Sequence, residues 1–105
     1  MIPRSTYSEK GQAALPQEWD AALACAQADV ATIYPGQDTP QPILVYVVAA
    51  AIVHLAATRR APLYGDLVNF LGARTNRELQ WELSSSPDPA ARQIGELIKG
   101  LPEAR

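Results

Sequence analysis

Apolar residues recur at helical spacing along most of this chain, and their pattern predicts five helices. The first helix is expected over residues 16–33, where Pro16 suits the first turn and Pro35-Gly36 follows the last. At about 100° per residue one apolar stripe forms along it. The stripe contains Trp19, Ala22, Leu23, Ala26, Val30 and Ile33.

The second helix, expected over residues 42–60, is apolar on every side. Its most hydrophobic run, from Ile43 to Ala57, is broken only by Tyr46 and His54. A helix without a polar face belongs at the centre of a fold. The run is shorter than the roughly 20 residues that cross a bilayer, so we expect a buried core helix and no membrane contact.

Three shorter helices are expected in the last part of the chain. One covers about residues 63–71 and stops at Gly72. The next begins at Thr75-Asn76-Arg77-Glu78, a capping box in which the threonine and glutamate side chains each bond the other's backbone N–H. The last begins at Asp88-Pro89. The residues expected to face inward are Leu67, Val68, Leu71, Leu79, Leu83, Ile94, Leu97, Ile98 and Leu101.

These elements predict one all-α domain packed around the second helix. A chain of 105 residues can bury one modest core. Residues 1–15 are polar and irregular and are expected to form a loose arm, and residues 16–105 form the helical domain. No strand is convincing, although the sequence leaves room for a short one near residues 61–63 or at the N-terminus.

The composition narrows the function classes. The net charge is −2 and the pI about 5.2, which excludes a generally basic nucleic-acid coat. The charge is nevertheless uneven, because no Lys or Arg occurs between Gly11 and Thr58, whereas four arginines stand against Asp66 alone between positions 59 and 77. Such a local excess indicates either a docking face or an ordinary solvated surface.

Candidate catalytic residues are few. The single cysteine, Cys25, rules out an intramolecular disulfide and fits a reducing, cytoplasmic location. The single histidine, His54, sits on the most apolar helix, where a core histidine with one hydrogen-bond partner is expected. An enzyme built on a Cys25–His54 pair across two packed helices is the competing hypothesis. We expect no enzyme, no metal and no cofactor.

Residues 63–83 have the spacing of a helix-turn-helix unit, whose second helix enters the major groove of DNA. Arg, Asn and Gln side chains can read base edges, and further arginines can hold phosphates. The candidate DNA contacts are Arg59, Arg60, Arg74, Thr75, Asn76, Arg77 and Gln80. Asp66, Glu78 and Glu82 would repel phosphate, so a helix-turn-helix unit with a purely structural role is the competing interpretation.

The run Pro62-Leu63-Tyr64-Gly65-Asp66-Leu67, followed by Gly72, resembles the start of a winged-helix unit. Over about 20 residues it is similar to the DNA-binding part of the alkylguanine DNA alkyltransferases and alkyltransferase-like proteins. The resemblance implies that Tyr64 lies close to DNA phosphates and that the helix after Gly72 is the recognition helix. The Pro-Cys-His-Arg motif of alkyl transfer is absent, Val68 replaces a small residue, and no strand pair follows to form a wing.

Trp81 lies on a different face of the expected helix from Leu79 and Leu83. It either packs under the last helix or stands exposed as the anchor of a protein interface.

Two functions are therefore expected. The first is a small DNA-binding transcription regulator or accessory protein, acting as a dimer because so small a monomer binds weakly. The second is a protein-binding module, such as an inhibitor, adaptor or immunity-type protein, that docks through its acidic N-terminal half or through Trp81. DNA binding requires Arg59, Arg60, Arg74 and Arg77 to form one continuous positive patch. Protein binding predicts that these arginines are scattered or paired with Glu78 and Glu82.

Overall fold

The computed structural model describes residues 13–33, 41–60 and 62–99, and all the regular structure in these ranges is helical. This confirms the all-α fold class. Each helix begins and ends within about three residues of the expected positions. The helices are α2 (Trp19–Ile33), α3 (Gln41–Thr58), α4 (Tyr64–Gly72), α5 (Asn76–Ser84) and α6 (Pro89–Ile98).

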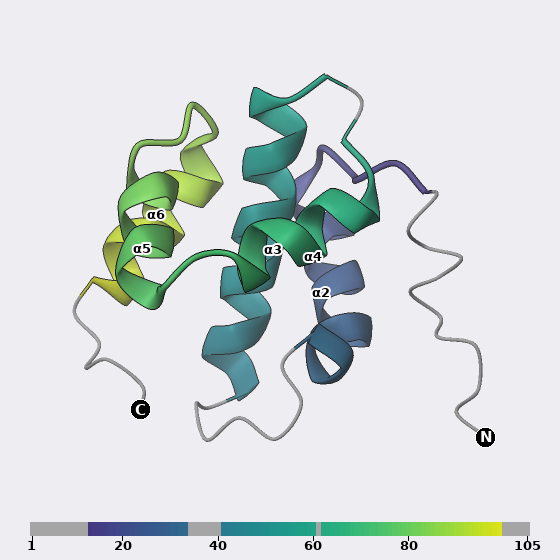
Figure 1. The fold of residues 1–105 in the computed structure, drawn as a ribbon, viewed down its shortest axis with the longest axis horizontal. Coiled ribbons are helices and arrows are strands. Elements are labelled where there is room, and N and C mark those ends of the chain that lie inside the picture. The colour runs from purple at the N-terminus through teal and green to yellow at the C-terminus, as the bar shows by residue number, and fades with distance from the viewer. Residues whose placement is uncertain (1–12, 34–40, 61, 100–105) are drawn as a thin grey trace.

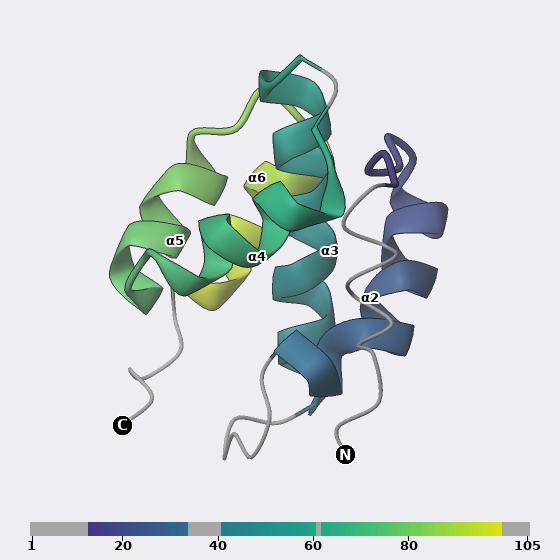
Figure 2. The ribbon, with the colours of Figure 1, turned by 45° about the vertical axis from the view of Figure 1, so that its right-hand side comes forward.

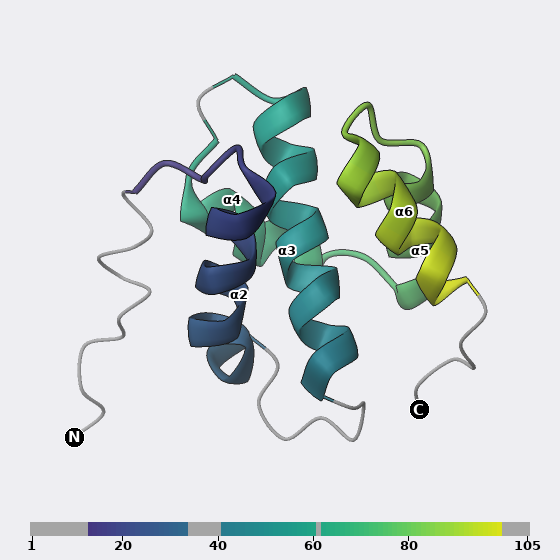
Figure 3. The same ribbon diagram turned by 180° about the vertical axis from the view of Figure 1, so that it is seen from behind.

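Helix α3 runs through the middle of the molecule. It has α2 on one side, α5 and α6 on the other, and α4 crossing one face (Figures 1 and 3). Every residue from Val47 to Leu55 is buried. The prediction of a central helix is thus confirmed, because all sides of α3 are covered by neighbouring helices. None of the helices described here is long and apolar enough to span a membrane.

Helix α2 packs alongside α3 through its predicted stripe (Figure 2). Ala22, Ala26 and Val30 are buried, so small side chains let the two helices approach closely. At the start of α2, the Trp19 ring stacks on Tyr46 of α3 with 6.5 Å between ring centroids and 9° between ring planes. This stacking covers one edge of the α2–α3 contact.

Helices α5 and α6 form an antiparallel pair that packs on α3. Both predicted N-caps are confirmed: Thr75 begins α5 in a capping box with Glu78, and Asp88 accepts hydrogen bonds from the backbone at the start of α6. The two helices touch at Gly95. A Cβ atom there would lie 2.5 Å from the backbone nitrogen of Ser84, so this close approach requires glycine.

The inward face of α4 differs from the expected one. Val68 is 40% exposed, because the buried positions follow Tyr64, Leu67 and Phe70 and leave Val68 at the side. The helix ends at Gly72, as the sequence predicts. The cap that follows, Ala73, has ordinary right-handed angles, with φ −90° and ψ −7°.

On α6, Leu97 is 54% exposed and not part of the core. The inner face of that helix consists of Ala91, Ile94, Gly95 and Ile98, and Leu97 lies to one side of it. The remaining residue of the expected stripe, Leu101, falls outside the described residues.

The segment before α2 is not a loose arm throughout. The backbone N–H of Leu15 donates to the carbonyl oxygen of Pro62 at 3.0 Å, and Tyr64 N–H donates to Ala13 at 3.1 Å. These bonds form an isolated antiparallel bridge between Ala14 and Leu63. Residues 13–15 of the expected arm therefore pair with residues 62–64. Their partner segment overlaps residues 61–63, where the sequence left room for a short strand. Residues 1–12 fall outside the described part of the chain.

Candidate binding surface on α5 and the charged cluster behind it

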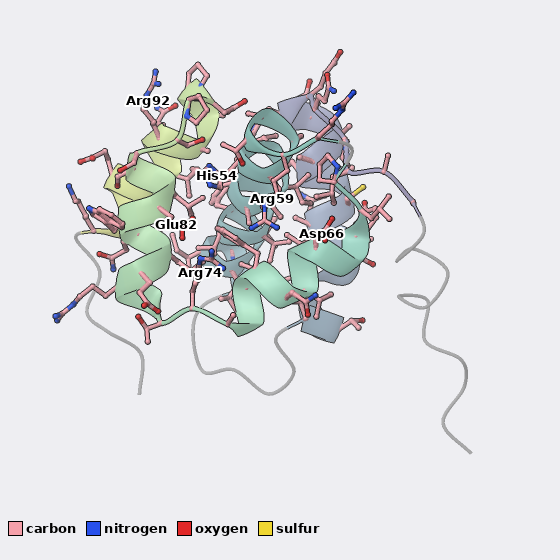
Figure 4. All side chains as sticks on the ribbon, turned by 45° about the horizontal axis from the view of Figure 1, so that its top comes forward. His54, Arg59, Asp66, Arg74, Glu82 and Arg92 are labelled. Carbon is pink, nitrogen blue, oxygen red and sulfur yellow. The ribbon has the colours of Figure 1, made fainter. Side chains whose placement is uncertain are left out.

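Three titratable side chains meet where α3, α5 and the turn before α5 come together (Figure 4). The Nε–H of Arg74 donates to Oε1 of Glu82 at 2.7 Å. The other carboxylate oxygen, Oε2, lies 3.7 Å from Nε2 of His54. A single carboxylate therefore faces a permanent cation on one side and a titratable ring on the other.

The guanidinium of Arg74 is held from three directions. Besides the bond to Glu82, its Nη1 donates to the carbonyl oxygen of Phe70 at 3.2 Å. Its Cζ lies 4.1 Å from the centroid of the Phe70 ring, a cation–π arrangement. Phe70 itself is buried in the core. Arg74 is consequently fixed in place, and its charge is balanced by Glu82.

The imidazole of His54 is confirmed as a core group, since only 10% of the side chain is exposed. Its ring packs against Phe70, with 5.6 Å between centroids. The 3.7 Å to Glu82 is too long for a hydrogen bond, and Nδ1 has no hydrogen-bond partner among the described residues. The expected single hydrogen bond of this side chain is therefore not formed there.

Burial lowers the pKa of His54 below its usual 6.5, because the charged ring would lose its hydration. The Glu82 carboxylate opposes this effect and raises the pKa. Arg59 and Arg74 repel a proton on the ring and lower it further. His54 is accordingly neutral at pH 7. Its ring contacts come from α4 and α5, whereas Cys25 lies half-buried on α2.

The outer face of α5 carries Trp81, which is 72% exposed. The alternative that this ring packs under α6 is thus wrong. Leu79 and Leu83 occupy the inward face and are buried, which leaves Trp81 on the solvent side. Ser84, the last residue of α5, is half-buried, and its hydroxyl would lie 2.8 Å from a Cβ on Gly95 of α6.

Beside Trp81 the surface is hollowed, with a volume of about 370 Å³. Arg74 and Glu82 line this hollow and also belong to the charged cluster, so the cluster lies directly behind it. We call this feature the Trp81 hollow. It is lined by Ala73, Arg74, Glu78, Trp81 and Glu82.

The four arginines predicted to contact DNA differ in their exposure. Arg59 and Arg60 are exposed just after the end of α3. Arg77 is exposed in the first turn of α5. Arg74 is half-buried and forms an ion pair with Glu82. DNA binding requires one continuous positive patch of these four arginines, and the charge of one of them, Arg74, is balanced by an ion pair.

The other residues predicted to contact DNA are placed less favourably. Tyr64 is only 4% exposed, so the surface position implied by the winged-helix resemblance is wrong: this ring belongs to the core. Thr75 accepts from the Glu78 N–H at 3.2 Å as the helix cap. Gln80 is half-buried. Asn76 begins α5, and its side chain falls outside the described part of the structure.

The packing of α4 and α5 also differs from that of a helix-turn-helix pair. α4 rests on α3 while α5 rests on α6, and α4 and α5 share only marginal contact. Residues 73–75 connect the two helices without regular structure (Figure 1). α4 and α5 follow each other at the spacing of a helix-turn-helix unit, but they do not pack closely against each other.

No metal-binding cluster of three or more His, Cys, Asp or Glu side chains occurs within the described ranges. Comparisons with protein-family models, with curated proteins and with solved structures found no match to this chain.

Phe70 is a partner of Arg74 that is not identified from the sequence. Phe70 falls on the helical continuation of Tyr64 and Leu67, which is the signal that could have placed its ring in the core. Glu82 follows Arg74 by eight positions, a spacing that no helix-face rule covers. From the sequence, Glu82 is therefore one of two possible acidic partners of the arginines, and the structure pairs it with Arg74.

Proposed function

We propose that this chain is a binding module that docks on another protein through the outer face of α5. The observation that carries the proposal is that the residue Trp81 is 72% exposed. Tryptophan is among the residues most enriched at energetic centres of protein interfaces, because it buries a large, rigid surface on contact. The proposal assigns no catalytic step and no cofactor to the chain.

The surroundings of Trp81 favour a protein over DNA as the partner. Glu78 and Glu82 lie on the same hollow, where they would repel phosphates. Arg74, the cation of that hollow, is balanced by its 2.7 Å ion pair with Glu82. Pairing of the arginines with neighbouring acids is what protein binding predicts. Inhibitors, adaptors and immunity-type proteins are the kinds of protein that act by such docking.

A DNA-binding regulator is the second candidate. The observation in its favour is that Arg59 and Arg60 are consecutive and exposed at the end of α3. Together with the exposed Arg77 they could contact phosphates without Arg74.

The test of the first candidate starts from partner capture and ends on a measured affinity. Wild-type protein, Trp81→Ala and Leu97→Ala are immobilised and exposed to lysate from cells that encode the chain. Leu97 is the matched control, because it is a large apolar side chain, 54% exposed, on α6. A partner retained by wild type is then purified and titrated by calorimetry. We expect Trp81→Ala to weaken binding by about 30-fold or more and Leu97→Ala by less than about three-fold.

An equal affinity for all three proteins would refute docking through Trp81. The second candidate is tested with a mixed pool of labelled duplex DNA at low and at physiological salt, using Arg59→Ala/Arg60→Ala as the variant. Binding that falls steeply with salt and is lost in the variant would support the DNA-binding regulator instead.

A further inference from the structure

We propose that the Trp81 hollow receives a basic side chain, a guanidinium or an ammonium group, from the protein partner. This inference rests on the proposed function and specifies the chemistry of the contact. It follows from three features of the hollow: its charge, its aromatic wall and the way its own cation is held.

The lining of the hollow has an excess of negative charge. Glu78 and Glu82 contribute two carboxylates against the single guanidinium of Arg74. Arg74 is already committed to Glu82 and to the Phe70 carbonyl oxygen. Glu78 uses Oε1 to accept from the Thr75 N–H at 2.8 Å, and the residue is exposed. Its carboxylate is therefore the charge that an incoming group meets, which favours a cation.

The indole of Trp81 supplies the second element of a cation site. A cation within about 6 Å of an aromatic ring is attracted by the negative face of the ring, and tryptophan is the strongest of the aromatic residues in this respect. The same protein already contains this arrangement, with Arg74 Cζ 4.1 Å from the Phe70 centroid. A guanidinium or ammonium lying along Trp81 would in addition be near the Glu78 carboxylate, three residues earlier on α5.

A carboxylate ligand fits the hollow less well. It would need the charge of Arg74, which the ion pair with Glu82 balances, and it would approach Glu78 as a like charge. Arg77, the arginine within α5, is not among the residues that line the hollow. The volume of about 370 Å³ lies at the small end of ligand sites, which suits one long side chain rather than a larger ligand.

The experiment uses two blocked peptides that differ only in charge, acetyl-Gly-Arg-Gly-Arg-Gly-amide and the same peptide with glutamate in place of arginine. Each is titrated into the full chain at low ionic strength, where exposed charges are least screened. The readout is the indole N–H signal of Trp81 in ¹H–¹⁵N NMR spectra. The chain has two tryptophans, and Trp19→Phe assigns the signals while keeping an aromatic ring against Tyr46.

We expect the arginine peptide to shift the Trp81 signal saturably and the glutamate peptide to leave it in place. Glu78→Gln should weaken the arginine peptide about two- to five-fold, and its amide oxygen can still accept from the Thr75 N–H. Glu96→Gln is the matched control, because it removes a carboxylate on α6 that lies outside the hollow and pairs with Lys99. This control should bind the peptide as wild type does.

No shift with the arginine peptide, an equal shift with the glutamate peptide, or an unchanged affinity of Glu78→Gln would each overturn the inference. The proposed function fails on a different result. If Trp81→Ala still binds the captured partner with wild-type affinity, the docking surface itself is wrong. If Trp81→Ala loses the partner while the arginine peptide does not bind, only the basic-side-chain inference is wrong.

Discussion

The His54 imidazole on α3 and the Glu82 carboxylate on α5 face each other across the contact of two helices, with 3.7 Å between Nε2 and Oε2. Arg74 bonds the other oxygen of the same carboxylate. Because the chain has no other histidine, the protonation of His54 reports on this cluster alone. The titration of this one imidazole can therefore test how the cluster is arranged.

The free energy of unfolding should decrease as the pH falls through the range in which histidine side chains take up a proton. Burial lowers the pKa of His54 below 6.5, so the unfolded chain binds this proton at a higher pH than the folded protein does. The contribution of the neutral ring to stability is therefore complete above about pH 6.5 and is lost as the pH falls toward the folded-state pKa. Urea unfolding between about pH 7.5 and pH 5.5 measures this loss. His54→Gln should flatten the curve, and an unchanged slope in that variant would assign the effect to other groups.

Glu82→Gln and Arg74→Met should move the pKa of His54 in opposite directions. The Glu82 carboxylate raises this pKa and the Arg74 guanidinium lowers it. Glu82→Gln should therefore lower the pKa, and Arg74→Met should raise it, both by the imidazole NMR signals as a function of pH. Each variant should also lose about 1 kcal/mol of unfolding free energy, because the pair is partly exposed. Shifts in the same direction would contradict the arrangement.

Gly95→Ala should destabilise the protein by about 2 kcal/mol, since the added Cβ would overlap the backbone of α5. Gly72→Ala is the matched control. A Cβ at Gly72 has nothing within 4 Å, and alanine favours the helical state by about 0.5–1 kcal/mol. Thermal or urea unfolding of both variants compares them directly. If the two substitutions had equal effects, the close contact of α5 and α6 would be wrong.

Thr75→Ala should lower the unfolding free energy by about 1 kcal/mol through loss of the α5 cap. The threonine hydroxyl accepts from the Glu78 N–H at 3.2 Å, and alanine leaves that donor without its partner. Thr75→Ser keeps a hydroxyl and should stay within about 0.5 kcal/mol of wild type. A serine variant as unstable as the alanine variant would argue against the cap.

The helices were predictable because their signals are local. Thr75 and Asp88 cap helices through atoms two or three residues away, and α3 is apolar in every direction, so it could only be central. The burial of Tyr64 was not predictable in this way, since it depends on how α4 crosses the core rather than on a motif.

The candidate site depended on contacts that span the turn before α5. Arg74 lies in the segment that joins α4 to α5, and it contacts Glu82 because of the path that residues 73–75 take between the two helices. The sequence identified Trp81 as the residue to examine, but it left open whether this ring was covered. Only the packing of α6, through Gly95, against Leu83 and Ser84 of α5 shows that it is not.

The pairing of Ala14 with Leu63 bears on the order in which the fold assembles. Its two hydrogen bonds join segments separated by about fifty residues, and closing so long a loop costs conformational entropy that the bridge alone does not repay. These bonds should therefore form after α2 has docked on α3 and should open before the centre of the molecule does. In hydrogen–deuterium exchange the amide of Leu15 would then lose its protection early, while the amides of Ala50 and Ile52 would retain theirs longest. The segment before α2 is thus fastened last, onto a fold that has already formed, and is not part of the folding nucleus.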